Sequence, residues 1–150
     1  MKKPMIVALV AAAAAAGGAV FATQSRGPQG PLMVVYKSPT CGCCTAWVTH
    51  VKKAGFRVEI HDTLAVEPVK TRWGVPDDLI SCHTAKVEGY VIEGHVPADL
   101  IQRLLTEKPA VLGIATPGMP SGSPGMDGTP EPYDVVTFEK DGKTELYARR

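Results

Sequence analysis

The pattern of apolar and polar positions predicts a strand, a helix and a second strand near the start of the folded part of the chain. The run Leu-Met-Val-Val-Tyr at residues 32–36 is apolar and rich in strand-forming side chains, which indicates a buried strand. Residues 41–54 follow with helical spacing, and we expect Thr40 to cap this helix and Gly55 to end it. Residues 56–60 alternate between apolar and charged side chains, which indicates the second strand.

The rest of the chain continues with elements of both kinds. Residues 65–74 have the pattern of a short helix, and residues 85–93 that of one or two strands interrupted by a glycine. A further helix begins at Pro97. Its apolar stripe at helical spacing consists of Leu100, Ile101, Leu104 and Leu105. Residues 135–138 and 144–148 flank an Asp-Gly turn, which predicts a β-hairpin.

The order of these elements predicts a single α/β domain over residues 32–150. A strand, a Cys-x-x-Cys at the start of a helix, and then strand, helix, strand and helix is the order of a thioredoxin-like fold. We expect such a domain, extended by a Gly/Pro/Met loop at residues 116–132 and by the hairpin. In thioredoxin-like folds the loop that enters the third strand carries a cis-proline facing the cysteine pair. Residues 81–84, "SCHT", stand at this place, so two soft-metal ligands replace the proline.

The N-terminal segment predicts export. Lys2 and Lys3 precede an uncharged run of small and apolar residues, which is typical of a signal peptide over residues 1–22, with an uncleaved membrane anchor as the alternative. Residues 23–31 then form a short Gly/Pro-rich tether. We therefore expect the domain in the periplasm. Without the leader, acidic and basic residues nearly balance and no basic block remains, so nucleic-acid binding has no support.

Three of the four cysteines crowd into one short stretch, which indicates chemistry at these sulfurs. Cys41, Cys43 and Cys44 lie at the predicted helix start, where the helix dipole stabilises a thiolate, and Cys82 lies beside His83. A thiol–disulfide oxidoreductase needs only Cys41 and Cys44. Four thiols and a histidine instead favour a soft-metal centre for Cu(I), zinc or an iron–sulfur cluster. Two structural disulfides remain a third alternative, disfavoured by the adjacent cysteines.

The loop at residues 116–132 adds thioethers to this set. Met119 and Met126 stand among glycines, prolines and serines, and thioethers bind Cu(I) but compete poorly for zinc. The alternative is a linker whose methionines pack on the domain. Among the other histidines, His50 lies too far along the helix to share an ion with Cys43. For His95, a role at the rim of the site and a position as a solvated histidine before the helix are equal alternatives.

Four motifs of the chain, "SPTCGCC", "SCHT", "VEGYVIEGHVPADLI" and "PGMPSGSPGM", together resemble the CopG-like copper-resistance proteins, a former domain-of-unknown-function family. The resemblance extends over residues 33–148. It implies a thioredoxin-like fold, a periplasmic location and copper handling through the family's cysteine positions, here Cys41, Cys43, Cys44 and Cys82. His83, Met119 and Met126 fall inside the other shared motifs, and their role as ligands is our own hypothesis.

We therefore expect an exported copper-binding protein that holds one to a few Cu(I) ions and that links copper redox chemistry to its thiols. The expected metal ligands are Cys41, Cys43, Cys44, Cys82, His83, Met119 and Met126. The alternative is a periplasmic thiol–disulfide oxidoreductase acting on protein partners, with Cys41 and Cys44 as its catalytic pair. The expected partners are copper ions and other periplasmic copper-handling proteins, with no nucleic acid, and with a membrane only if the N-terminal segment stays uncleaved.

Overall fold

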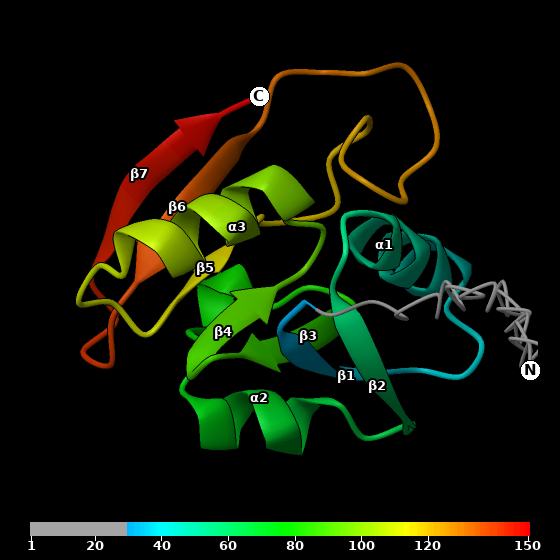
Figure 1. The fold of residues 1–150 in the computed structure, drawn as a ribbon, viewed down its shortest axis with the longest axis horizontal. Coiled ribbons are helices and arrows are strands. Elements are labelled where there is room, and N and C mark those ends of the chain that lie inside the picture. Colours follow the sequence, from blue (N-terminus) through cyan, green and yellow to red (C-terminus); the bar gives the residue numbers. More distant parts are fainter. Residues whose placement is uncertain (1–29) are drawn as a thin grey trace, which may run out of the picture.

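The computed structural model describes residues 30–150, so the predicted signal peptide and nearly all of the predicted tether lie outside the described residues. Within the described part, no helix is long and apolar enough to cross a membrane. The elements in chain order (Figure 1) are β1 (Leu32–Lys37), α1 (Gly42–Lys53), β2 (Arg57–Asp62), α2 (Glu67–Trp73), a 3-10 turn (Asp77–Leu79), β3 (His83–Val87), β4 (Tyr90–Glu93), α3 (Ala98–Glu107), β5 (Gly113–Ala115), β6 (Asp134–Phe138) and β7 (Thr144–Arg149).

All strands of residues 30–150 join one seven-stranded sheet in the order β2-β1-β3-β4-β5-β6-β7. The pairs β1–β2 and β4–β5 are parallel, and the other neighbours are antiparallel. Because β3 runs antiparallel to β1, the end of β1 and the start of β3 lie at the same edge of the sheet, with Lys37 opposite His83. This edge carries the cysteines.

Helices cover both faces of the sheet. The helices α1 and α3 pack on one face, and α2 lies on the other (Figure 1). Alternation along the strands separates the two cores: Ile92 and Ile114 face α1 and α3, whereas Val91 and Ala115 face the side of α2. The larger core also buries Trp47 completely, and its indole Nε1 donates to the carbonyl of Val96 at 2.9 Å. This bond ties α1 to the loop that leads into α3.

The sequence-based expectation of a single α/β domain with a C-terminal hairpin is confirmed, and the finer thioredoxin-like assignment stays a prediction. Strand β5 was not predicted, because it has only three residues and all of them are buried, so it shows no alternation. The predicted cap of α1 was wrong. Thr40 lies inside a turn closed by the Cys41 amide and the Ser38 carbonyl at 3.2 Å, so the helix begins one residue later with Cys41 as its N-cap.

The Gly/Pro/Met loop between β5 and β6 is packed against the domain rather than hanging free. The loop passes beside the start of α1, where a Cβ on Gly125 would lie 2.7 Å from the carbonyl oxygen of Cys43 and from the amide nitrogen of Trp47. Gly125 also has a φ of +88°, which favours glycine. Ser123 is buried, and the Ser81 hydroxyl donates to the carbonyl of Gly118 at 3.1 Å. The loop therefore forms one wall of the region around the cysteines.

Candidate metal centre

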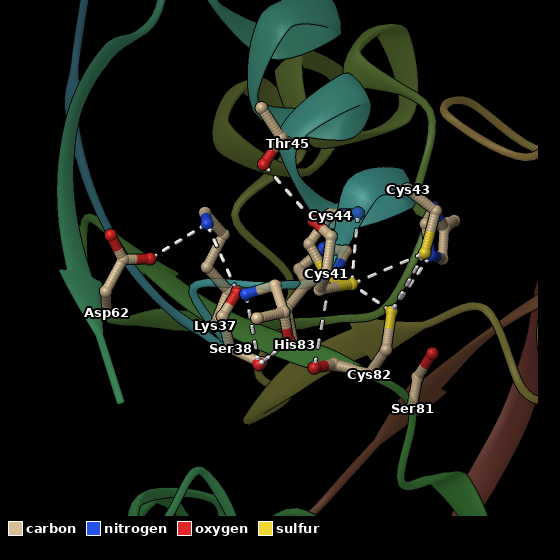
Figure 2. Close-up of a disulfide and its surroundings, with 12 residues drawn as sticks. Lys37, Ser38, Cys41, Cys43, Cys44, Thr45, Asp62, Ser81, Cys82 and His83 are labelled. Carbon is tan, nitrogen blue, oxygen red and sulfur yellow. Dashed lines mark hydrogen bonds and ion pairs between the residues drawn. A yellow bond between two sulfur atoms is a disulfide. The ribbon is translucent and has the colours of Figure 1, made fainter. Parts of the chain in front are cut away.

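The four cysteines come together from two separate segments. Cys41, Cys43 and Cys44 lie at the junction between β1 and α1, and Cys82 immediately precedes β3. Figure 2 shows the sulfurs of Cys41, Cys43 and Cys82 turned toward one another. The sulfur atoms of all four lie within 4.8 Å of one another and could hold a metal ion. The sulfur of Cys82 thus lies close to those of Cys41 and Cys44, as expected from the place of residues 81–84 opposite the cysteine pair.

Two of the four cysteines are joined in a disulfide. The bond links Cys41 and Cys44, and Cys43 and Cys82 are free thiols. The sulfur of Cys43 lies between the two segments, 3.4 Å from the sulfur of Cys41 and 4.0 Å from that of Cys82. The backbone amide of Cys44 donates to the sulfur of Cys41 at 3.3 Å, so this helix start will stabilise a Cys41 thiolate once the disulfide is reduced.

His95 joins the centre from the segment directly after β4, which pairs with β3 in a hairpin. Its Nε2 lies 3.0 Å from the sulfur of Cys82. Its Nδ1 is 2.8 Å from the carbonyl of Pro124, and because a carbonyl only accepts, Nδ1 carries the proton of the neutral ring. The lone pair of Nε2 is therefore turned toward Cys82. Burial lowers the pKa of His95, although the hydrogen bond to Pro124 acts in the opposite direction. The lowered pKa keeps the lone pair of Nε2 unprotonated.

His83 lies beneath Cys82 and is completely buried. Its Nδ1 is 3.4 Å from the sulfur of Cys82, and its ring packs on Trp47 with centroids 4.4 Å apart. Its Nε2 has no hydrogen-bond partner. Burial lowers the pKa of His83 well below its ordinary value, and the nearby His95 and Lys70 add to this effect. Cys82, His83 and His95 form a second group whose ligand atoms lie within 4.8 Å of one another.

The free thiol of Cys82 is protonated at neutral pH. Burial is the main cause that raises the pKa of Cys82 to about 11, and the neighbouring Cys43 raises it further. Metal ions bind the thiolate, so a metal that binds here must displace this proton. Metal binding at Cys82 should therefore weaken as the pH falls.

A buried ion pair supports the segment that carries Cys82. The Oε1 atom of Glu93 accepts from the Ser81 amide at 2.7 Å and from the ammonium group of Lys70. Both charged side chains are buried almost completely. Burial raises the pKa of Glu93, while the Lys70 charge and these hydrogen bonds act in the opposite direction. Through Glu93, the ion pair holds Ser81, the residue before Cys82, from the face of the sheet on which α2 lies.

The remaining predicted residues lie outside this cluster of side-chain contacts. Met119 is 54% exposed on its loop, and Met126 is half-buried directly after Gly125. Their role as ligands stays a prediction. His50 serves another purpose: its Nε2 accepts from the Ala98 amide at 3.0 Å and so satisfies the start of α3. This agrees with its exclusion from the metal site.

Sequence reasoning left the role of His95 open, although a signal for it existed. Residues 88 and 89 form the two-residue turn between β3 and β4, and both have positive φ. A turn of this length sets the register, which pairs Thr84 with Glu93. The amide of Gly94 continues the ladder by donating to the carbonyl of His83 at 3.2 Å. The next opposed pair is Cys82 and His95, so the turn alone would have placed them together.

The donor chemistry of this cluster fits a soft metal ion. Four thiolates from two segments would be available after reduction, and thiolates select Cu(I), zinc and iron–sulfur clusters. Two imidazoles lie beside Cys82 at hydrogen-bonding distance. In the disulfide form, only Cys43 and Cys82 keep a thiol. The oxidation state of Cys41 and Cys44 therefore decides how many thiolates can bind.

Comparisons with known proteins agree with this chemistry. A family model described as "Protein of unknown function, DUF411" matches residues 79–126. Two solved structures named copper resistance protein copG, Form 2 and Form 1, are each 38% identical to this chain and cover 81% of it. The chain covers 99% and 98% of theirs, with TM-scores of 0.76 and 0.75. None of the curated proteins matches the chain.

Proposed function

Because the chain belongs to the CopG-like family of copper resistance proteins, we propose that it binds Cu(I) through the thiolates of Cys41, Cys43, Cys44 and Cys82. The observation that carries this proposal is the gathering of the four sulfur atoms within 4.8 Å of one another. Sulfurs at such separations can bridge ions, so one to a few Cu(I) ions fit the site. His83, Met119 and Met126 complete the proposed ligand set.

The disulfide supports a link between copper and thiol redox chemistry. In the proposed step, the thiolates of Cys41 and Cys44 give up one electron each to two Cu(II) ions, and the two sulfurs join. The products are two Cu(I) ions and the disulfide. Reduction of this bond by a dithiol would return the Cys41 and Cys44 thiolates, so that all four are again available.

The proposed location is the periplasm, in line with the signal-peptide pattern of residues 1–22. A resistance protein in that compartment would bind copper before it enters the cytoplasm, and it would exchange copper with other periplasmic copper-handling proteins. Thioether ligands suit this setting, because they have no thiol that an oxidant could convert to a disulfide.

The test of this function is the metal content of the protein produced in the periplasm, combined with a count of reactive thiols. Copper that co-purifies should mask thiols, and chelation under reducing conditions should expose all four cysteines. A protein that carries no copper after growth with added copper, and whose thiols react equally before and after chelation, would contradict the proposal.

A second candidate function is thiol–disulfide exchange with protein partners, which the Cys41–Cys44 disulfide favours. Such an enzyme would reduce insulin disulfides at a rate comparable to that of a thioredoxin. We expect much slower reduction here, because Cys43 lies 3.4 Å from the sulfur of Cys41 and offers a competing internal partner. A thioredoxin-like rate would favour this second function.

A further inference from the structure

We infer that the disulfide form keeps a smaller metal site, in which Cys43, Cys82, His83 and His95 hold a single ion. This inference rests on the proposed copper-binding function and adds a regulation to it. Reduced protein would use four thiolates, and oxidised protein would use two thiolates and two imidazoles. The state of the Cys41–Cys44 pair would then set both the capacity and the metal preference of one centre.

The separations between the sulfur of Cys82 and the other three donor atoms are close to those that a tetrahedral ion requires. Metal–sulfur bonds of about 2.3 Å and metal–nitrogen bonds of about 2.0 Å put two sulfurs about 3.8 Å apart and a sulfur and a nitrogen about 3.5 Å apart. The two free sulfurs are 4.0 Å apart. The sulfur of Cys82 is 3.4 Å from Nδ1 of His83 and 3.0 Å from Nε2 of His95. Cys82, His83 and His95 already form one group of ligand atoms, and the sulfur of Cys43, which belongs only to the group of cysteines, would have to turn toward the two histidines to complete the site.

The two imidazoles are held in place for this role. The carbonyl of Pro124 accepts from Nδ1 of His95, an arrangement that orients metal-binding histidines in general. His83 is fixed between Trp47 and His95, with its ring edge-on to that of His95 at 5.0 Å. It is completely buried, its Nδ1 contacts the sulfur of Cys82, and its Nε2 has no hydrogen-bond partner.

Closing the disulfide changes the ligand chemistry in a defined direction. When Cys41 and Cys44 pass two electrons to two Cu(II) ions and bond to each other, both leave the set of thiolates. The remaining two-sulfur, two-nitrogen set suits ions of intermediate softness, such as Zn²⁺ and Co²⁺, as well as copper. Oxidation would therefore release the copper that depends on Cys41 and Cys44 while one ion stays bound.

The experiment uses the full mature chain with its disulfide intact and titrates it with Co²⁺, whose absorption bands report thiolate ligands and coordination geometry. Thiol counting under denaturing conditions first verifies the two free thiols. We expect one equivalent of Co²⁺ with a tetrahedral spectrum and displacement by Zn²⁺. His95→Gln and Cys43→Ser should each weaken binding by about tenfold or more. His61→Gln, which changes a partly exposed histidine outside the site, should bind like the parent.

A second variant makes the test independent of the oxidation state. Cys41→Ser with Cys44→Ser cannot form the disulfide, and under reducing conditions it should still bind one Co²⁺ ion with the same spectrum. If the disulfide form and this double variant both fail to bind Co²⁺, or if His95→Gln binds as tightly as the parent, the inference is wrong. Cu(I) titration of the fully reduced parent in parallel tests the proposed function separately, because it depends on all four thiolates.

Discussion

The sulfur of Cys82 lies 3.0 Å from Nε2 of His95 across the open end of the β3–β4 hairpin. His95 in turn donates to the carbonyl of Pro124 in the Gly/Pro/Met loop. One histidine thus connects the hairpin, the cysteine cluster and the loop. The packing of this loop on α1 consequently affects which ring nitrogen faces the thiol.

Replacing Cys41 by serine should remove most Cu(I) binding without unfolding the protein. Cys41 is the N-cap of α1, and serine is among the best N-cap residues, so the reduced variant should match the stability of the reduced parent. The loss of one thiolate should weaken Cu(I) binding by about tenfold or more, near 1.4 kcal/mol. Competitive titration against a chromophoric Cu(I) chelator, with urea unfolding as the stability control, measures both. Unchanged Cu(I) affinity would remove Cys41 from the ligand set.

The double change Met119→Leu with Met126→Leu tests the thioethers. Leucine keeps the volume and the apolar character, so a packing role would survive. If the methionines are ligands, Cu(I) affinity should fall by about tenfold while zinc affinity stays nearly unchanged, because zinc has little use for thioethers. Titration of both metals against the same chelators separates the two cases. A double variant with the affinity of the parent for both metals would show that the loop has only a structural role.

Glu93→Gln should destabilise the protein strongly. The substitution leaves the buried ammonium of Lys70 without its counter-charge, and breaking a buried pair in this way costs about 3–5 kcal/mol. Glu93→Gln combined with Lys70→Met should recover much of that loss, since no buried charge remains. Urea unfolding of the three proteins measures the effect. A single variant as stable as the parent would show that the pair is not needed to hold Ser81 and Cys82.

The capping histidine His50 predicts a pH dependence of stability. It accepts from Ala98 only when neutral, and burial lowers the pKa of His50, with Asp99 opposing and Lys53 adding to this effect. The pKa of His50 in the folded state lies below its unfolded-state value of about 6.5. The hydrogen bond to Ala98 therefore contributes fully to stability above about pH 6.5. It is lost as the pH falls through the folded-state pKa. His50→Gln removes this titration.

Stability between pH 7 and pH 5 should therefore fall less in His50→Gln than in the parent, by about 1 kcal/mol, the usual worth of a helix cap. Because His83 and His95 also have lowered pKa values, both proteins should keep some pH dependence. Urea unfolding at several pH values gives the difference. Parallel pH profiles for the two proteins would mean that the contact with Ala98 contributes nothing.

The elements that alternate clearly or carry clear end signals could be predicted from the sequence. Gly55 and Gly74 both end helices with positive φ, as their positions indicated. Strand β5 could not be predicted, because its three buried residues carry no periodic signal and only pairing with β4 and β6 makes it a strand. The prediction that Thr40 caps α1 was wrong because the Ser38 carbonyl and the Cys41 amide close a turn around Thr40. Local propensity does not reveal this turn.

At the candidate site, the gathering of the cysteines could be predicted from the sequence, but the contacts that hold their segments in place could not. Cys82 could be placed beside Cys41 because the order of elements brings the two segments to one edge of the sheet. The ion pair of Lys70 and Glu93 could not be foreseen, since it joins two charged residues of ordinary appearance inside the core. Nor could the sequence predict that the loop packs on α1, a contact that depends on Gly125.

The most direct test of the account is a Cu(I) titration of the reduced parent beside Cys82→Ser. The central claim is that both segments build one copper site, and Cys82 is the only cysteine of its segment. Competition against a chromophoric chelator should show tight Cu(I) binding by the parent and loss of most of it in the variant, with circular dichroism unchanged. A Cys82→Ser protein that binds as many Cu(I) ions as the parent, with equal affinity, would contradict the shared site.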